Sequence, residues 1–349
     1  MPTSNAHPTV ASRIAMNWTT VPLGLLAMLL GIGMFLLVGD VSIDARTTFD
    51  ALFAHDSQQT AHVLIRDWRL PRAIADLLVG ASLAIAGAIM QSMTRNPLAS
   101  PGIMGLNTGA SFATIVAVVT APTIGRPGLM VAAVAGATLG AALVYGIGSL
   151  SRGGLTPVRL ALTGVAVSTL LGSIGSGVMI YFELGQDLTL WYARGTQNVQ
   201  WDDVAMLLPL FAIGLVGSLA LAPTLSVLAL GEEVARSLGQ RTMLAKLAGT
   251  VIVLMLAGGS VAVAGSVGFV GLMVPHIVRM LVGHDQRVVL PMAALSGGLF
   301  LLAADIVARL ATSPYRAAVP VSVVTSLLGV PFFLYLACRR NASARGGTL

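Results

Sequence analysis

The feature that most constrains this chain is a succession of long apolar runs with almost no charge inside them. Of its 349 residues, 56% are hydrophobic and 10% are charged, and the mean hydropathy is +0.86. Soluble domains carry about 25% charged residues, so this chain has too few to cover a surface in water. An apolar bilayer core of about 30 Å needs about 20 helical residues per crossing. The sequence therefore predicts a polytopic membrane protein. It is expected to be all-α, because the runs lack the alternation of barrel strands.

Ten apolar segments, bounded by charged residues or by proline and glycine, are predicted to be membrane helices. They cover residues 21–38, 71–90, 103–119, 129–150, 158–182, 204–225, 243–264, 269–282, 289–310 and 319–337. The eighth is short and contains Pro275, so a broken or incomplete crossing is expected there. We expect one transmembrane domain over residues 1–349, with an N-terminal tail at 1–20 and a C-terminal tail at 338–349.

The distribution of basic residues predicts the orientation. An even number of crossings places both termini on one side of the membrane. If that side is the cytoplasm, twelve of the 20 lysines and arginines lie inside and eight lie outside. This excess favours cytoplasmic termini, because positive loops are retained there.

Rare residues exclude several kinds of chemistry. Lys246 is the only lysine and does not stand in a Gly-Lys-Ser/Thr phosphate loop, so any ATP hydrolysis of that type must occur on a partner. Cys338 is the only cysteine and permits no intrachain disulfide. The five histidines form no metal-ligand spacing. No metal or other cofactor is expected on this chain.

The segment between the sixth and seventh apolar runs is predicted to be a short cytoplasmic helix. Two glutamates stand at its start, Glu232 and Arg236 have i,i+4 spacing, and Gly239 fits a C-terminal cap. Val234 and Leu238 lie one turn apart and form an apolar ridge that could enter a groove on another protein. The alternative is a loop helix that packs on its own bundle.

Two further segments have unusual composition. Residues 95–105 contain two prolines and two glycines, which predicts irregular backbone either inside the bundle or in a plain cytoplasmic turn. Thr169, Ser173 and Ser176 lie on one face of the fifth segment. This small, hydroxyl-bearing face could line a water-filled pathway, although spacing alone favours a helix–helix contact. Gly136 and Gly140 are expected to form such a contact.

Few ionisable residues lie inside the apolar segments. Asp305 stands four residues before Arg309, and Asp76 stands four residues after Arg72. Local i,i+4 ion pairs are therefore the simplest prediction for both carboxylates. His276 follows Pro275 and is expected to satisfy backbone groups rather than to bind a metal.

Arginines on the predicted outer side admit two interpretations. Arg69, Arg72 and Arg309 stand at segment ends, where they could extend to the membrane surface as anchors. They could also form a cationic face for an acidic partner, because guanidinium pairs with carboxylate in two-point geometry.

Several motifs together resemble the FecCD family, the permease subunits of ABC importers for iron-siderophores, haem and vitamin B12. They are RLPR at 69–72, LVGASLAIAGAIMQ at 78–91, NPLASPG at 96–102, LGEEVARSLG at 230–239, GFVGLMVPH at 268–276 and ADIVAR at 304–309. The resemblance runs from about residue 69 to the C-terminus. It implies a type II ABC importer fold of about ten helices in the bacterial inner membrane.

The resemblance also implies partners and roles. The partners are a second permease subunit, identical or homologous, two cytoplasmic ATPases that bind ATP and Mg²⁺, and an extracytoplasmic binding protein. Arg69, Arg72 and Arg309 match the arginines that receive glutamates of the binding protein. Thr156 and Pro157 fall at the cytoplasmic gate, where the vitamin B12 permease has a second hydroxyl residue in place of Pro157. The coupling helix that enters the ATPase comprises Gly231, Glu232, Glu233, Val234, Ala235, Arg236, Leu238 and Gly239.

The function expected from the sequence is import of a metal chelate, a ferric siderophore first, with haem or vitamin B12 as alternatives. An ion-gradient-driven secondary transporter is the second hypothesis, and it would require paired carboxylates near the midplane and broken helices in two matching halves. A membrane enzyme ranks last, because no nucleophile–base pair is supported by spacing.

Overall fold

The computed structural model describes residues 10–38, 43–150, 157–184, 195–312 and 319–345, and these residues form helices and connecting segments without strands. The all-α prediction is confirmed. The ten main helices are α1 (Val10–Leu37), α4 (Leu70–Thr94), α5 (Leu106–Thr120), α6 (Arg126–Ser149), α7 (Pro157–Tyr181), α9 (Trp201–Leu230), α11 (Thr242–Ala264), α12 (Val270–Val282), α13 (Gln286–Leu310) and α14 (Val321–Arg345). The short elements are α2 (Ala45–Phe53), α3 (Thr60–Val63), η1 (Leu64–Arg69), η2 (Pro101–Met104), η3 (Gly195–Asn198) and α10 (Glu232–Ser237).

Each main helix coincides with one predicted segment. Within the described residues, six helices are long and apolar enough to cross a membrane, and four apolar stretches are shorter. Two of the short stretches belong to α1 and α14, whose full helices have 28 and 25 residues. The other two are α5 and α12, with 15 and 13 residues. The eighth segment is therefore short, as predicted, although α12 continues through Pro275 without a break, and α5 is short as well.

Two helices continue into the predicted tails. The helix α1 begins at Val10 rather than near residue 21, and α14 continues to Arg345 rather than ending at residue 337. Polar residues without glycine or proline do not end a helix, so each helix extends beyond its apolar run. At the C-terminal side, the first glycines after residue 338 are Gly346 and Gly347.

The helix α4 forms the centre of the bundle. In the continuous run Thr60–Thr94 that contains it, 89% of the most apolar 18-residue stretch is buried. The helix α4 packs on α9, α11, α12 and α13. Glycines allow its backbone to approach two of them closely: Gly80 crosses Gly297 of α13, and Gly87 crosses Gly271 of α12. A methyl group at Gly87 would lie 1.8 Å from the Gly271 carbonyl oxygen. Such contacts are typical of membrane helices, where small residues permit close packing.

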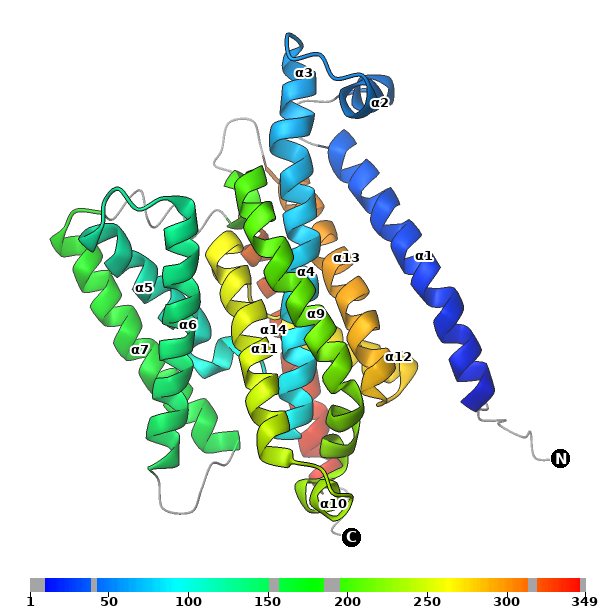
Figure 1. The fold of residues 1–349 in the computed structure, drawn as a ribbon, viewed down its shortest axis with the longest axis vertical. Coiled ribbons are helices and arrows are strands. Elements are labelled where there is room, and N and C mark those ends of the chain that lie inside the picture. The colour runs from blue at the N-terminus through cyan, green and yellow to red at the C-terminus, as the bar shows by residue number, and fades with distance from the viewer. Residues whose placement is uncertain (1–9, 39–42, 151–156, 185–194, 313–318, 346–349) are drawn as a thin grey trace.

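The helices α5, α6 and α7 pack on one another beside this central bundle, and α7 lies outermost (Figure 1). Gly109 of α5 faces Gly136 and Gly140 of α6, where an added methyl group at Gly136 would lie 2.3 Å from the Gly109 carbonyl oxygen. The predicted contact role of Gly136 and Gly140 is therefore confirmed. On the other side of the bundle, α1 packs along α13.

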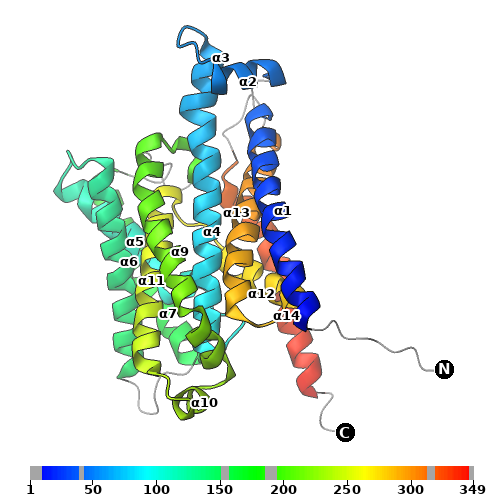
Figure 2. The same ribbon diagram turned by 45° about the vertical axis from the view of Figure 1, so that its right-hand side comes forward.

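The two ends of the bundle carry different elements. The start of α1, the end of α14 and α10 lie together at one end, and α2 and α3 lie at the opposite end (Figures 1 and 2). We call these the α10 end and the α3 end. The helices α3, η1 and α4 form one continuous run, Thr60–Thr94, that extends past the bundle at the α3 end (Figure 2).

Irregular backbone interrupts the bundle at two places, before α5 and before α12. Arg95 and Gly105 adopt positive φ values of 49° and 72°, and Gly105 packs against Gly140 of α6. The prediction of irregular backbone at residues 95–105 is confirmed, and the segment runs from an exposed Arg95 to a buried Gly105. The Asn107 side-chain amide donates to the Ser266 hydroxyl (3.2 Å), which joins this segment to the linker before α12.

Candidate functional site

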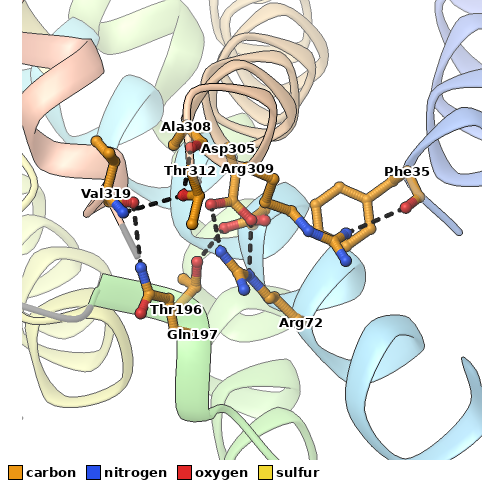
Figure 3. Close-up of polar contacts among 10 residues, drawn as sticks. Phe35, Arg72, Thr196, Gln197, Asp305, Ala308, Arg309, Thr312 and Val319 are labelled. Atoms are coloured by element: carbon orange, nitrogen blue, oxygen red, sulfur yellow. Dashed lines mark hydrogen bonds and ion pairs between the residues drawn. The ribbon is translucent and has the colours of Figure 1, made fainter. Parts of the chain in front are cut away.

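Three regions carry the predicted functional residues: the arginines near the α3 end, the helix α10, and one face of α7. The arginines come from elements far apart in sequence. Arg69 ends η1, Arg72 lies in the first turn of α4, and Arg309 lies in the last turn of α13. The crossing of α4 and α13 brings these turns together, and the end of α1 packs beside them (Figure 3).

Two of the arginines hold the C-terminal end of α1. The Arg69 Nη1 atom donates to the Leu36 carbonyl oxygen (2.6 Å), and the Arg309 Nη1 atom donates to the Phe35 carbonyl oxygen (3.1 Å). The Arg309 guanidinium also lies 4.4 Å from the centre of the Phe35 ring. The last carbonyls of a helix have no intrahelical partners and form its negative pole. Arg69 and Arg309 therefore cap α1 in the tertiary structure.

The third arginine forms a buried two-point ion pair. The Arg72 Nε and Nη2 atoms each lie 2.7 Å from a carboxylate oxygen of Asp305, which is fully buried. Asp76 is also fully buried, and its Oδ1 atom accepts a hydrogen bond from the Thr196 hydroxyl (2.6 Å). Both predicted i,i+4 pairs are therefore wrong, because Arg72 reaches across to α13 and Arg309 turns toward α1.

Further polar contacts tie the neighbouring segments to this cluster (Figure 3). The Gln197 side-chain amide donates to the Val319 carbonyl oxygen (3.1 Å), and the Val319 N–H donates to the Thr312 hydroxyl (3.1 Å). Together with Thr196, these contacts join η3 and the start of α14 to the end of α13. We call Arg69, Arg72, Arg309, Asp76, Asp305 and Thr196 the arginine cluster. Thr196, Gln197 and Thr312 could not be predicted as members of this site, because single polar residues in loops carry no periodic pattern.

The burial of the cluster bears on its availability to a partner. Arg69 is only 4% exposed, and the Arg72 side chain is 14% exposed. Arg309 is partly buried. Each arginine already has an intramolecular partner in this conformation, so a docking role requires an exchange of partners, and it stays a prediction.

The predicted short helix is present as α10, at the end of the bundle that also holds the start of α1. Gly231, with φ 143°, separates it from α9, and Gly239, with φ 75°, follows it. The N–H of Gly239 donates to the Arg236 carbonyl oxygen (2.9 Å) and the N–H of Gln240 donates to the Ala235 carbonyl oxygen (2.9 Å). The predicted glycine cap is therefore confirmed.

Ion pairs fix α10 to the bundle. The Glu232 carboxylate lies 2.8 Å from the Arg236 guanidinium, as predicted, and 2.5 Å from the Lys246 ammonium of α11. The hydrogen bond and charge of Lys246, together with the charge of Arg236, lower the pKa of Glu232 below its ordinary value. Lys246 is a partner that the sequence analysis missed, because it lies 14 residues away.

The outward face of α10 remains open. Ala235 is buried against the bundle, whereas Val234 is 43% exposed and Leu238 is 63% exposed. Glu233 is also exposed. The helix thus packs on its own bundle through one face and presents the predicted apolar ridge on the other. Packing on the bundle and an exposed ridge for a partner, which the sequence offered as alternatives, are therefore both present.

The hydroxyl-bearing face of α7 lies away from the bundle. Thr169, Ser173 and Ser176 are all exposed, whereas Val167 and Leu171 are buried against α5 and α6. The alternative of a helix–helix contact within this chain is therefore wrong for that face. Its polar groups can border either a second subunit or a water-filled route.

The two predicted gate residues lie at the N-terminal boundary of α7. Thr156 lies outside the described residues, and Pro157 is the first residue of α7, with its side chain also outside the description. Within the described residues, no group of three or more His, Cys, Asp or Glu side chains could hold a metal ion.

Comparisons with known proteins identify the family. The family model described as the FecCD transport family matches residues 10–339. The chain is 46% identical to the iron(3+)-hydroxamate import system permease protein FhuB of Bacillus subtilis, over 91% of this chain and 82% of that protein. It is 38% identical to the iron-uptake system permease protein FeuB of the same organism, over 95% of this chain and 99% of that protein.

A solved structure supports the same assignment. It is described as an inward-facing conformation of a metal-chelate type ABC transporter, and it aligns with a TM-score of 0.75 at 27% identity. The alignment covers 92% of this chain and 99% of that chain. The type II importer fold expected from the sequence is thereby confirmed. The chain belongs to the FecCD transport family, as a multi-pass membrane subunit of a transporter.

Proposed function

We propose that this chain is the permease subunit of a bacterial ABC importer that carries a ferric siderophore across the inner membrane. The observation that carries this proposal is the 46% identity, over 91% of the chain, to an iron(3+)-hydroxamate import permease. The 38% identity to a second iron-uptake permease supports the same substrate class. Haem and vitamin B12 are the alternatives within the family.

The translocation route is proposed to run along the exposed face of α7. Thr169, Ser173 and Ser176 would form one wall, and the corresponding face of a second permease subunit would form the other. A wall of small hydroxyl groups and aliphatic side chains offers weak contacts to a passing chelate. Selectivity would then come from the binding protein rather than from a tight site in the membrane.

The α10 end is proposed to face the cytoplasm, with both termini on that side. ATP binding and hydrolysis on two partner subunits would move α10 through its exposed ridge of Val234 and Leu238. The pairing of Glu232 with Lys246 would pass that movement to α11, because the two charges join α10 to the long helix. Thr156 and Pro157 are proposed to lie at the cytoplasmic gate between α6 and α7.

The α3 end is proposed to receive an extracytoplasmic binding protein through Arg69, Arg72 and Arg309. Arg72 and Arg309 are the more accessible of the three, and Arg69 would mainly position the end of α1. Reversing Arg72 and Arg309 to glutamate should weaken docking, with a larger effect at low salt because exposed charges are then less screened. Unchanged docking in the reversed variant would refute this surface.

The test of the transport proposal is uptake by the reconstituted complex. The permease, its ATPases and its binding protein would be placed in liposomes, and ATP-dependent entry of a radiolabelled ferric trihydroxamate would be measured against haem and vitamin B12. Faster entry of the trihydroxamate supports the proposal. Uptake of any solute by this chain alone, driven by a proton or sodium gradient, would instead revive the secondary-transporter hypothesis.

A further inference from the structure

The core of the arginine cluster contains two buried carboxyl groups. Asp76 and Asp305 are both fully buried and interact electrostatically. Arg72 is bound to Asp305, and Thr196 supplies a neutral donor to Asp76. The Asp76 Oδ2 atom is buried without a hydrogen-bond donor among the described residues. The ion pair between Arg72 and Asp305 is therefore the main interaction that compensates the negative charge of this buried site.

Arg72 occupies the boundary between this core and the surface. Two of its nitrogens, Nε and Nη2, face Asp305, and the side chain keeps 14% of its surface exposed. Its third nitrogen, Nη1, has no hydrogen-bond partner among the described residues. A guanidinium that is bound on one edge and open on another can be approached by a second carboxylate from outside the protein.

We propose that Asp305 is an internal competitor for Arg72, so that a carboxylate of the docked binding protein must draw Arg72 away from Asp305, and this exchange loosens the α3 end. The inference rests on the proposed docking function, and it adds Asp305 as a residue that opposes docking through Arg72.

The exchange has a structural consequence. Once Arg72 turns outward, the buried Asp305 carboxylate loses the guanidinium that compensates it. A buried charge without its partner is strongly destabilising. The destabilisation falls between α4 and α13, because Asp76 stands on the first helix and Asp305 on the second. Docking would therefore favour separation of these elements at the α3 end, where the chelate has to enter.

The proposal predicts that removing a buried ion-pair partner strengthens docking of the binding protein. Asp305→Asn removes the competitor and leaves Arg72 available, so the binding protein should dock about tenfold more tightly, which corresponds to about 1.4 kcal/mol. A purely structural ion pair predicts the opposite, because loss of a buried partner disorders the site and weakens docking.

Asp76→Asn provides the matched control. It changes the second carboxyl group of the same buried site to an amide of nearly equal size. It leaves the Arg72–Asp305 pair intact, and the new amide can donate a hydrogen bond to Asp305. Docking by this variant should therefore be unchanged or weaker than in the wild type.

The experiment measures the dissociation constant of the binding protein on the full complex in nanodiscs at low salt. The variants are Asp305→Asn, Asp76→Asn, Arg72→Gln and the double variant Arg72→Gln/Asp305→Asn. Support consists of tighter docking in Asp305→Asn alone, with no gain when Arg72 is also replaced. Unchanged or weaker docking in a correctly assembled Asp305→Asn complex overturns the inference, as does an equal gain in Asp76→Asn.

Two further outcomes are separated by this design. If Arg72→Gln leaves docking unchanged, the proposed docking surface itself is wrong. If Arg72→Gln weakens docking but Asp305→Asn does not strengthen it, only the competition is wrong. Should Asp305→Asn fail to assemble, Asp305→Glu replaces it. Its longer side chain keeps the charge but loses the two-point geometry, so it should still dock more tightly than the wild type, and docking no tighter than wild type would overturn the inference.

Discussion

Replacing Gly87 with alanine should strongly destabilise the protein, because the added methyl group meets backbone rather than a flexible side chain. The new Cβ would lie 1.8 Å from the Gly271 carbonyl oxygen and 2.7 Å from the Gly271 Cα. Ordinary carbon contacts are about 3.5 Å, so α4 and α12 must move apart by roughly 1.5 Å. A gap of even 0.5 to 1 Å forfeits about a quarter to a half of each neighbouring contact.

The expected loss of stability follows from this displacement. Overpacking in a core costs about 1–3 kcal/mol, and more where the backbone has to shift. We therefore expect Gly87→Ala to cost about 3 kcal/mol or more. For a large domain this lowers the melting temperature by roughly 5–10 °C.

The structure also predicts an order among related substitutions. At Gly80 the new methyl group would lie 2.2 Å from the Gly297 carbonyl oxygen, and at Gly271 it would lie 2.7 Å from the Leu83 carbonyl oxygen. Gly80→Ala should therefore be nearly as harmful as Gly87→Ala, and Gly271→Ala should be milder.

Gly146 of α6 provides the matched control, because no atom of the described residues lies within 4 Å of an added methyl group there. Gly146→Ala should be neutral or stabilising by up to about 1 kcal/mol, since alanine favours the helix. The assay is thermal unfolding of the detergent-solubilised protein, followed by size-exclusion chromatography of a fluorescent fusion. The reasoning would be refuted if Gly87→Ala melted with the wild type, or if Gly146→Ala lost as much stability.

Three other predictions concern the coupling helix and the pathway. Because Lys246 lowers the pKa of Glu232, their attraction is present above the ordinary pKa of 4.5 and is lost as the pH falls through the lower folded-state value. The difference in melting temperature between wild type and Glu232→Gln should therefore shrink in acid. A difference that stays constant with pH would contradict this. Glu233→Arg should uncouple ATP hydrolysis from uptake without changing the melting temperature, because Glu233 is exposed; undiminished uptake would count against the role of α10. Ser173→Leu should slow chelate uptake at unchanged stability, because the side chain is exposed on α7; normal uptake would argue against that wall.

Local features of this chain could be predicted because the atoms that determine them are close in sequence. The helix α10 follows from glycines that allow positive φ on both sides and from an i,i+4 pair. The short length of α12 follows from an apolar run too short to cross the membrane. The extents of α1 and α14 were predicted less well, because hydropathy marks where lipid can lie and not where a helix ends.

The partners of the buried charges could not be predicted in the same way. Arg72 and Asp305 are 233 positions apart, and each has an oppositely charged residue four positions away that looks equally suitable from spacing alone. The crossing of α4 and α13 at Gly80 and Gly297 decides between the two arrangements, because it brings the carboxylate of one helix within 2.7 Å of the guanidinium of the other.

The sequence by itself determined that this chain lies in lipid as about ten helices, because lipid cannot satisfy backbone polar groups and long apolar runs must then form helices. It also determined the exposed helix at the α10 end. Only the tertiary structure decided which polar groups compensate one another at the α3 end. A buried charge is stabilised by the nearest oriented partner in space, and for Arg69, Arg72 and Arg309 that partner belongs to another helix.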